Sequence, residues 1–470
     1  MGHTVEKIGG TSMSRLDELR DTLFLRDDPY GRIFVVSAFG GITDLLLEHK
    51  KSGKPGVYAM FASAESDHGW HEALDRAAQA MISAHEAVLE HDGDRARARE
   101  FVLERIEGVR TCLVDLQRLC SYGHFRLDEH LMQVRELLSG LGEAHSALSA
   151  ALMLRRAGVE ARLVGLSGWR DEGNVSLEER LESGLRGIDF ASELPIVTGY
   201  AQCAEGLMSE YDRGYSEITF SRLAALTGAD EAIIHKEFHL SSADPKLVGG
   251  DAVRKLGRTN YDVADQLSNM GMEAIHPGAA KTLRRAEVPL RVTNAFEPGD
   301  PGTLIDECAA EVPAVEIVTG LDVIALELFE QDMVGVKGYD AAILDVLTRH
   351  DVRIVSKVSN ANTITHYLDA SLKVIRRVER DLVKLYPQAR VSVRKLAIAS
   401  VIGRDLGGLD VLIRGLQALA DADLSAVGAA QGPRNVDVQF LMERGDLDGA
   451  IAALHGAFVG RGEMALAEAA

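Results

Sequence analysis

A chain of 470 residues, 46% of them hydrophobic and 26% charged, has the composition of a soluble globular protein with roughly two to four domains. Its net charge of −20 argues against nucleic acid as the main partner, because a phosphate backbone requires a basic face. No run of about 18 apolar residues indicates a membrane helix, and the N-terminus has no apolar signal core. The four cysteines are scattered, without disulfide or CxxC spacing. We therefore expect a cytoplasmic protein without a membrane partner.

The first 50 residues contain one three-part pattern twice. A short strand at residues 4–8 is followed by Gly9-Gly10 and an amphipathic helix. A second strand at residues 32–37 is followed by Gly40-Gly41 and another helix. Strand, glycine pair and helix in succession indicate an α/β fold with a parallel sheet.

The following segment is predicted to complete one α/β domain, residues 1–308. Residues 70–156 read as helical, with a single break near residues 121–123. Strands and helices are then expected at residues 159–166, 195–198, 218–226, 232–237, 261–270, 277–285 and 289–294.

The tail contains an internal duplication. Residues 338–347 resemble residues 408–417, and each lies within a β-α-β-β-α pattern. The first strands of the two copies are expected at residues 323–329 and 396–402. Two small ferredoxin-like units are therefore predicted at the C-terminus.

The glycine pair Gly9-Gly10 can bring backbone close to a ligand, and the N-terminus of the following helix suits phosphate. Lys7 places a positive charge beside that loop. A glycine pair alone is more often only a tight turn. The chain has neither the GxxxxGK[ST] nor the GxGxxG phosphate-binding pattern, so a nucleotide would be bound in another way.

Several motifs resemble those of aspartate kinases, in the same order along the chain. Residues 5–12 (Val-Glu-Lys-Ile-Gly-Gly-Thr-Ser) are similar to the N-terminal signature of that family, and residues 35–44 to its second motif. Gly142-Glu143 resembles the third motif, and residues 261–305 resemble the end of the kinase domain. The duplicated tail resembles the paired ACT domains of these enzymes.

The resemblance implies a three-layer amino-acid-kinase domain at residues 1–308 with a mostly parallel sheet. Two ferredoxin-like ACT domains follow, at residues 314–390 and 391–458. In this family one ACT unit can be inserted within the other, so residues 459–470 are a candidate to complete the first. The implied activity is ATP-dependent phosphorylation of the β-carboxylate of L-aspartate.

The resemblance also implies the catalytic residues. A carboxylate acceptor needs no general base, because its pKa of about 4 leaves it ionised. Catalysis must instead align two anions and neutralise the transferring phosphoryl group. Lys7 is implied for that task. Glu217, which replaces the usual Asp, is implied to orient Lys7 or the metal–nucleotide.

Five residues are implied to bind the substrate. Glu143 suits the α-ammonium group of aspartate, and Arg213 suits its α-carboxylate. Ser37, Thr43 and Ser216 supply hydroxyl groups.

The implied nucleotide residues depart in part from the family pattern. His235-Lys236 stands where the family has Thr-Asp, Lys246 replaces an arginine, and Glu273 replaces a lysine, which leaves the adenine and ribose contacts open. Magnesium is expected only as the partner of ATP, and no residue is assigned to a resident metal. The residues expected at the nucleotide are Gly9, Gly10, Thr11, Ser12, Lys236, Asp244 and Lys246.

The paired ACT domains imply a homodimer and an amino-acid effector site. Asn360 and Asn435 lie where effectors bind in the family. Because both loops depart from the usual pattern, we expect weak or no inhibition by lysine or threonine. The nucleotide segment, residues 234–242, together with residues 210–216, resembles the branch of aspartate kinases associated with ectoine synthesis.

Two alternatives stay open at this point. Glutamate, acetylglutamate, carbamate and UMP kinases share the α/β domain but lack the duplicated tail. A non-catalytic amino-acid sensor with a degenerate kinase domain would account for the changes at residues 235, 236 and 273. The presence of Lys7, Thr43, Glu143 and Arg213 together argues against that sensor.

Overall fold

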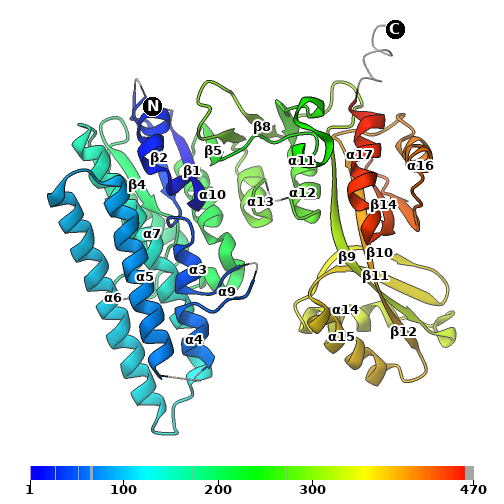
Figure 1. Cartoon of the computed structure of the whole chain (residues 1–470), viewed down its shortest axis with the longest axis horizontal. Coiled ribbons are helices and arrows are strands. Elements are labelled where there is room, and N and C mark those ends of the chain that lie inside the picture. Colours follow the sequence, from blue (N-terminus) through cyan, green and yellow to red (C-terminus); the bar gives the residue numbers. More distant parts are fainter. Residues whose placement is uncertain are drawn as a thin grey trace. The chain divides into compact units, whose positions relative to one another are not determined.

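The computed structural model describes residues 2–26, 28–50, 52–63, 67–171, 173–272 and 274–460. The chain forms two compact units (Figure 1): residues up to Leu240 join Ile275–Glu307 in the first, and Ser241–Ala274 joins the residues from Cys308 onward in the second. The first unit is thus interrupted by a segment that the sequence analysis assigns to the catalytic domain. The domain boundaries drawn from the sequence stay predictions.

The first unit is built on a mostly parallel sheet. Its strands follow the order β3-β4-β2-β1-β5-β7-β8, and the last pair, β7 and β8, is antiparallel. Every residue of β2 and β4 is buried, as expected for parallel strands covered on both faces. The strands are β1 (Thr4–Ile8), β2 (Arg32–Val36), β3 (Ala161–Val164), β4 (Leu194–Thr198), β5 (Glu231–Lys236), β7 (Leu290–Asn294) and β8 (Thr303–Asp306).

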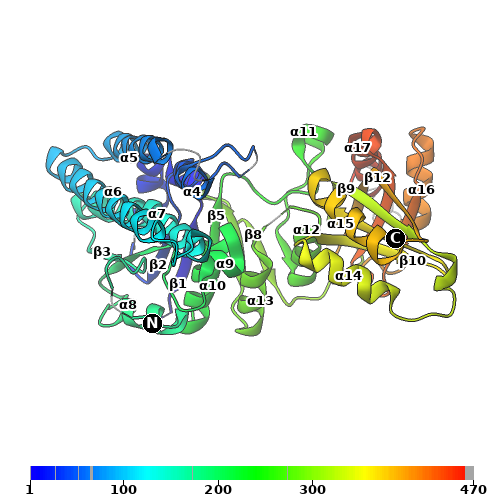
Figure 2. The ribbon, with the colours of Figure 1, turned by 90° about the horizontal axis from the view of Figure 1, so that it is seen from below.

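Helices cover both faces of this sheet, which makes the three-layer arrangement (Figure 2). The long helices α5, α6 and α7 run together, and α7 packs on β3 and β4, whereas α10 packs on β1 and also contacts α8 and α13. The helices are α1 (Gly10–Met13), α2 (Leu16–Leu19), the π-helix η1 (Arg20–Phe24), α3 (Ile42–Leu46), α4 (Val57–Ser63), α5 (Asp67–Val88), α6 (Asp92–Cys120), η2 (Leu127–Glu129), α7 (Leu131–Arg156), α8 (Leu177–Leu185), α9 (Leu207–Tyr211), η3 (Asp212–Gly214), α10 (Tyr215–Thr227) and α13 (Pro277–Arg285).

Helix α7 is the central helix of this unit. It is the one described helix whose length and composition would allow a membrane span, but 94% of its most apolar window is buried inside the protein, as in the core helix of a folded domain. The helical stretch before it has one more break than predicted, because α5 ends at Val88 and α6 begins at Asp92.

A buried network of charged and polar side chains joins four neighbouring strands of the sheet. Arg32 on β2 binds both oxygens of Glu6 on β1, at 2.7 and 2.9 Å. His235 on β5 lies 2.6 Å from Glu6 through Nε2 and 2.8 Å from Thr293 Oγ1 on β7 through Nδ1. Burial opposes ionisation of Glu6, but Arg32 and His235 hold its pKa well below the ordinary value. His235 therefore has a structural partner here and ties β5 to β1.

The second unit contains a six-stranded antiparallel sheet with the order β10-β11-β9-β12-β14-β13. Its helices form two separate hydrophobic cores, one with α14 and α15 and the other with α16 and α17. Its elements are α11 (Pro245–Val248), η4 (Gly250–Ala252), β6 (Arg258–Asn260), α12 (Tyr261–Asn269), β9 (Ile317–Phe329), η5 (Gln331–Met333), α14 (Tyr339–Arg349), β10 (Arg353–Ser359), β11 (Thr363–Asp369), α15 (Leu372–Leu385), β12 (Arg390–Ile402), α16 (Val411–Asp421), β13 (Gly428–Gln431), β14 (Asp437–Glu443), η6 (Arg444–Asp446) and α17 (Leu447–Phe458).

The two ferredoxin-like modules share their central strands. Strands β9 and β12 are each 13 residues long, about twice the predicted length, and pair along their whole length. Residues 324–329 begin the first module and residues 390–395 complete it, whereas residues 396–402 begin the second and residues 317–323 complete it. Helix α17 packs in the core of the second module, and residues 461–470 lie outside the described part of the chain.

Candidate active site

The predicted catalytic and substrate residues all lie in the first unit, around the carboxyl ends of its parallel strands. Lys7 lies near the end of β1, Ser37 follows β2 and Lys236 ends β5. Helix α7 contributes Glu143, and the turn η3 with the start of α10 contributes residues 213–217. Ligands of open α/β sheets bind at this edge, where strand order changes direction.

Lys7 and Glu217 form an ion pair. Lys7 Nζ lies 3.3 Å from Glu217 Oε1, and the two side chains are only 12% and 16% exposed. The backbone N–H of His276 donates to the other oxygen, Oε2. Burial alone would raise the pKa of Glu217, but Lys7 and then Lys236 keep it below the ordinary value. Two lysines thus lie close enough to Glu217 to influence its carboxylate.

Glu143 is the most deeply buried of the ionisable residues predicted at the site. Its side chain is 1% exposed, and Oε1 accepts a 2.6 Å hydrogen bond from Ser216 Oγ, which Ser37 Oγ approaches to 3.5 Å. The second oxygen, Oε2, has no hydrogen-bond partner among the described residues. Burial raises the pKa of Glu143 to about 8, against the opposing effects of Ser216, Lys7 and the backbone N–H of Tyr200. A buried carboxylate oxygen without a donor is a place for an incoming cation.

Arg213 is already bound to protein groups. Its Nη1 donates to Asp44 Oδ1 at 2.5 Å, and its Nη2 donates to the backbone carbonyl of Glu48. The side chain is 11% exposed. The sequence analysis did not identify Asp44 or Glu48 as partners of this arginine.

Tyr215 and Thr43 border the same side chains. Tyr215 is 3% exposed, and its ring lies edge-on to Tyr200 with a centroid distance of 5.6 Å. Burial and the nearby Glu143 raise the pKa of Tyr215 well above the ordinary value, opposed by a hydrogen bond with Thr43. The sequence had suggested no role for Tyr215.

The two glycine loops pack against each other. A Cβ atom on Gly10 would lie 2.7 Å from the carbonyl oxygen of Ala38, and one on Gly40 would lie 2.8 Å from Ser14 Oγ. A Cβ atom on Gly9 would meet nothing within 4 Å. Gly10 is thus required for close contact between the loops that follow β1 and β2.

Thr11 and Ser12 differ in exposure. Thr11 is exposed, whereas Ser12 is fully buried and donates a 2.6 Å hydrogen bond to Glu237 Oε1, just beyond β5. This hydroxyl is therefore satisfied within the protein and fixes the first glycine loop to the end of β5.

The other predicted residues lie in the second unit. Asp244 and Lys246 are exposed at the start of α11, where Asp244 Oδ1 accepts from the backbone N–H of Lys246. Asn360 Oδ1 accepts from the backbone of Asn362 and Thr363, within the β10–β11 turn. Asn435 has a left-handed φ of 53°, which asparagine tolerates well. Glu273 lies outside the described residues.

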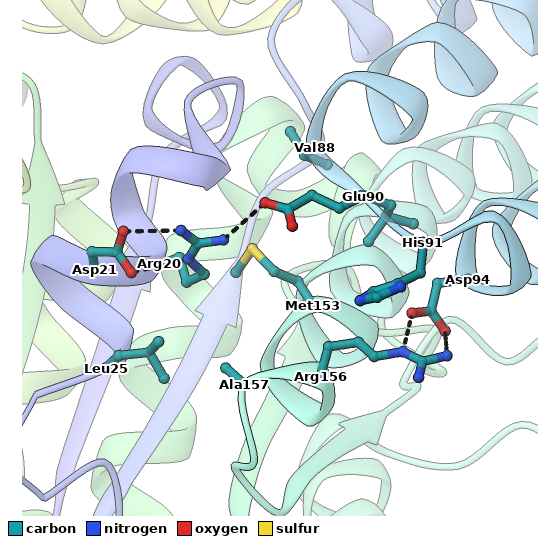
Figure 3. Close-up of a pocket in the computed structure, with 11 residues that line it drawn as sticks. Arg20, Asp21, Leu25, Val88, Glu90, His91, Asp94, Met153, Arg156 and Ala157 are labelled. Atoms are coloured by element: carbon teal, nitrogen blue, oxygen red, sulfur yellow. Dashed lines mark hydrogen bonds and ion pairs between the residues drawn. The ribbon is translucent and has the colours of Figure 1, made fainter.

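Two pockets are lined by residues of the first unit. One, of about 750 Å³, borders the second glycine loop and Asp44 and reaches α5. The other, of about 340 Å³, lies between η1 and the ends of α5 and α7 (Figure 3). Its charged side chains bind one another, Arg20 with Glu90 and Arg156 with Asp94. The second pocket contains none of the predicted site residues.

These observations define a class of protein: a three-layer α/β unit with a cationic site at its sheet edge, followed by two interlocked ferredoxin-like modules. The model of the amino acid kinase family matches residues 3–294. The chain belongs to the amino acid kinase family.

Individual relatives match nearly the whole of this chain. Aspartate kinase Ask_Ect of Stutzerimonas stutzeri is 53% identical over 463 residues, which are 97% of each chain. Chloroplastic aspartokinase 2 of Arabidopsis thaliana is 24% identical over 97% of this chain and 84% of its own. The structure of E. coli aspartokinase III with lysine and aspartate has a TM-score of 0.71 at 19% identity, covering 97% of this chain and 99% of that one. The predicted fold class is confirmed.

Proposed function

We propose that this protein is an aspartate kinase that transfers the γ-phosphoryl group of ATP to the β-carboxylate of L-aspartate, giving 4-phospho-L-aspartate and ADP. The relative at 53% identity is an aspartate kinase over nearly the whole chain. A structure of E. coli aspartokinase III with aspartate and ADP has the same fold, with a TM-score of 0.71. The proposal rests on the Lys7–Glu217 ion pair and on Glu143 Oε2, which has no hydrogen-bond partner among the described residues. Both features lie in the first unit.

In the proposed reaction an oxygen of the ionised β-carboxylate attacks the γ-phosphorus, and the bond from that phosphorus to the departing ADP oxygen breaks. Lys7 neutralises charge on the transferring group, and Glu217 holds the ammonium group of Lys7 in place. Lys236 adds a second positive charge beside Glu217.

The substrate is held by the two charged groups on its α-carbon. Its α-ammonium group donates to Glu143 Oε2, and its α-carboxylate accepts from Arg213. The hydroxyl groups of Ser37, Thr43 and Ser216 complete the site. Ser216 also fixes Glu143 through the 2.6 Å bond to Oε1.

ATP is expected at the loop of Gly9, Gly10, Thr11 and Ser12 and near Lys236, all in the first unit. For Asp244 and Lys246, which lie in the second unit, a nucleotide role stays an expectation from the sequence. Magnesium would neutralise the phosphates and be held mainly by them and by water, so we assign it no side chain. Because His235 binds Glu6 inside the sheet, its departure from the family pattern does not remove a group from the nucleotide side.

We further propose a cytoplasmic homodimer formed through the ACT modules, with an amino-acid effector near Asn360 and Asn435. Assignment to the ectoine-associated branch rests on the sequence of residues 234–242 and fits the name Ask_Ect of the relative. The non-catalytic sensor is not favoured, since the relative at 53% identity over nearly the whole chain is an aspartate kinase and Lys7, Glu143 and Arg213 are all present.

The test is an ATP-dependent phosphorylation assay with aspartate, glutamate and no acceptor measured side by side, with magnesium present. We expect turnover on aspartate and its loss in Lys7→Ala. Folded wild-type protein that phosphorylates none of these acceptors would contradict the proposal and return the sensor as the better account.

A further inference from the structure

The guanidinium group of Arg213 is anchored at both terminal nitrogens. Nη1 binds Asp44 Oδ1 at 2.5 Å and Nη2 binds the carbonyl of Glu48, while no partner of Nε is recorded among the described residues. An arginine carries five N–H donors in a rigid plane. Two anchored nitrogens therefore fix that plane and leave the Nε edge for another carboxylate.

The anchor is itself held in place. Asp44 Oδ1 also accepts from the backbone N–H of Lys50 at 3.3 Å. Glu48, whose carbonyl binds Arg213, has its carboxylate gripped by Arg135 through two bonds of 2.7 and 2.8 Å. Arg135 lies on the central helix α7, with its guanidinium 4.9 Å from the centre of the Tyr58 ring. The chain of contacts thus runs from the core helix to the substrate arginine.

Asp44 directly follows Thr43 in the short helix α3. One helix therefore presents a proposed substrate hydroxyl and also holds the proposed substrate arginine. Displacement of α3 would move both contacts together, which matters because small misplacements of binding groups reduce activity strongly.

We propose that Asp44 is a positioning residue for aspartate binding, which holds the Arg213 guanidinium in the orientation that receives the substrate α-carboxylate, with Arg135 and Glu48 as its support. This inference rests on the proposed function and deepens it. It predicts that substrate recognition depends on a carboxylate that never touches the substrate.

The opposite role for Asp44 has a distinguishable outcome. A carboxylate that merely occupies Arg213 would compete with the substrate, and its removal would lower the KM for aspartate. A positioning carboxylate has the reverse effect, because Arg213 without its anchor samples many orientations and binds aspartate more weakly.

The experiment measures kcat and the KM values for aspartate and ATP in Asp44→Ala, Asp44→Asn and Asp44→Glu. We expect Asp44→Ala to raise the KM for aspartate by about tenfold or more, with a smaller change in kcat and an unchanged KM for ATP. Asp44→Asn keeps an acceptor without the charge and should lie between Asp44→Ala and the wild type. Asp44→Glu keeps the charge and should restore part of the binding.

Two further variants separate positioning from general damage. Glu193→Gln removes a carboxylate paired with Arg162 at 3.0 Å, next to β4, and should leave all three constants unchanged. Arg135→Gln should raise the KM for aspartate less than Asp44→Ala, and the double variant should show less than the product of the two effects.

The outcomes are separable from those of the proposed function. Wild-type protein without turnover on aspartate would refute the proposed function. Active wild-type protein whose Asp44→Ala form has a lower or unchanged KM for aspartate would refute the positioning role alone. A lower kcat together with similarly raised KM values for aspartate and ATP, and a lowered melting temperature, would also refute the positioning role. Such a result would indicate a general structural effect.

Discussion

Ser216 Oγ donates a 2.6 Å hydrogen bond to Glu143 Oε1, joining the start of α10 to the middle of α7 inside the first unit. The bond satisfies one carboxylate oxygen and leaves Oε2 without a partner among the described residues. Since the side chain is almost fully buried, the carboxyl group is set to gain its charge when a cation arrives.

Aspartate binding should release a proton near neutral pH. Glu143 has a pKa of about 8 in the free protein, so it is mostly protonated at pH 7, and an α-ammonium group beside Oε2 favours the ionised form. We expect aspartate affinity to rise with pH up to about pH 8. Titration calorimetry in buffers of different ionisation enthalpy measures the released proton, and Glu143→Gln should abolish the release. Equal proton counts in both proteins would exclude Glu143 as its source.

The same group should make the free protein less stable as pH rises. The ordinary pKa of 4.5 is raised to about 8 on folding, so between these values the folded state binds more protons than the unfolded state. Stability is therefore lost with increasing pH across this window. Unfolding measurements at pH 5 and pH 8.5 should show Glu143→Gln gaining stability relative to wild type at the higher pH. A constant difference between the two proteins would contradict the assignment.

Replacement of Lys7 by alanine should lower kcat by at least ~10²–10³ while the protein stays folded, because Lys7 neutralises charge that develops in the transition state. Lys7 is partly exposed and its partner Glu217 keeps the His276 N–H, so the fold does not depend on it. Steady-state kinetics and circular dichroism measure the two effects. Near-normal kcat in Lys7→Ala would assign phosphoryl binding to another cation.

Gly10 and its neighbour Gly9 allow a matched comparison of two alanine variants. Gly10→Ala places a Cβ atom 2.7 Å from the backbone oxygen of Ala38, which cannot move without shifting the second glycine loop, whereas Gly9→Ala meets open space. We expect Gly10→Ala to cost about 1–3 kcal/mol of unfolding free energy and Gly9→Ala much less. Chemical denaturation of both variants measures the difference. Equal stability would show that the loops are not in close contact in solution.

Glu6→Gln should strongly destabilise the first unit. The substitution leaves Arg32 buried at 8% side-chain exposure without a counter-charge, and breaking a buried ion pair typically costs about 3–5 kcal/mol. The expected result is a lower denaturation midpoint at pH 7. Because the folded pKa of Glu6 lies below the ordinary value, its contribution is present above the ordinary pKa and is lost as the pH falls toward the folded value. An unchanged midpoint would mean that Arg32 finds another partner.

Lysine and threonine at millimolar concentration should inhibit weakly or not at all. Asn360 uses its side-chain oxygen in the β10–β11 turn, and Asn435 adopts a left-handed backbone conformation in its own loop. Both asparagines thus have local structural roles. Initial rates with increasing lysine, threonine and both together provide the measurement, and strong inhibition by either would contradict this expectation.

The sequence by itself determined the repeated strand–glycine–helix pattern and the tail duplication, and it supplied the candidate residues of the site. These are local patterns: periodicity, turn glycines and ordered motifs can be read within a short window. The carboxyl-end position of Lys7, Ser37 and Lys236 also follows, since parallel strands place their ends at one edge.

Only the tertiary structure decided which groups meet across long separations. The sequence placed the first strand of each C-terminal module correctly. It could not show that each strand continues into the other module, because the pairing of antiparallel strands is not visible in a local sequence pattern. In the sequence His235 is only a departure from the family pattern, whereas in the fold it pairs with Glu6, 229 residues away. It assigned Arg213 to the substrate α-carboxylate without a protein partner, whereas the fold pairs this arginine with Asp44, 169 residues away. Such contacts depend on the packing of the whole unit, which no local stretch of sequence specifies.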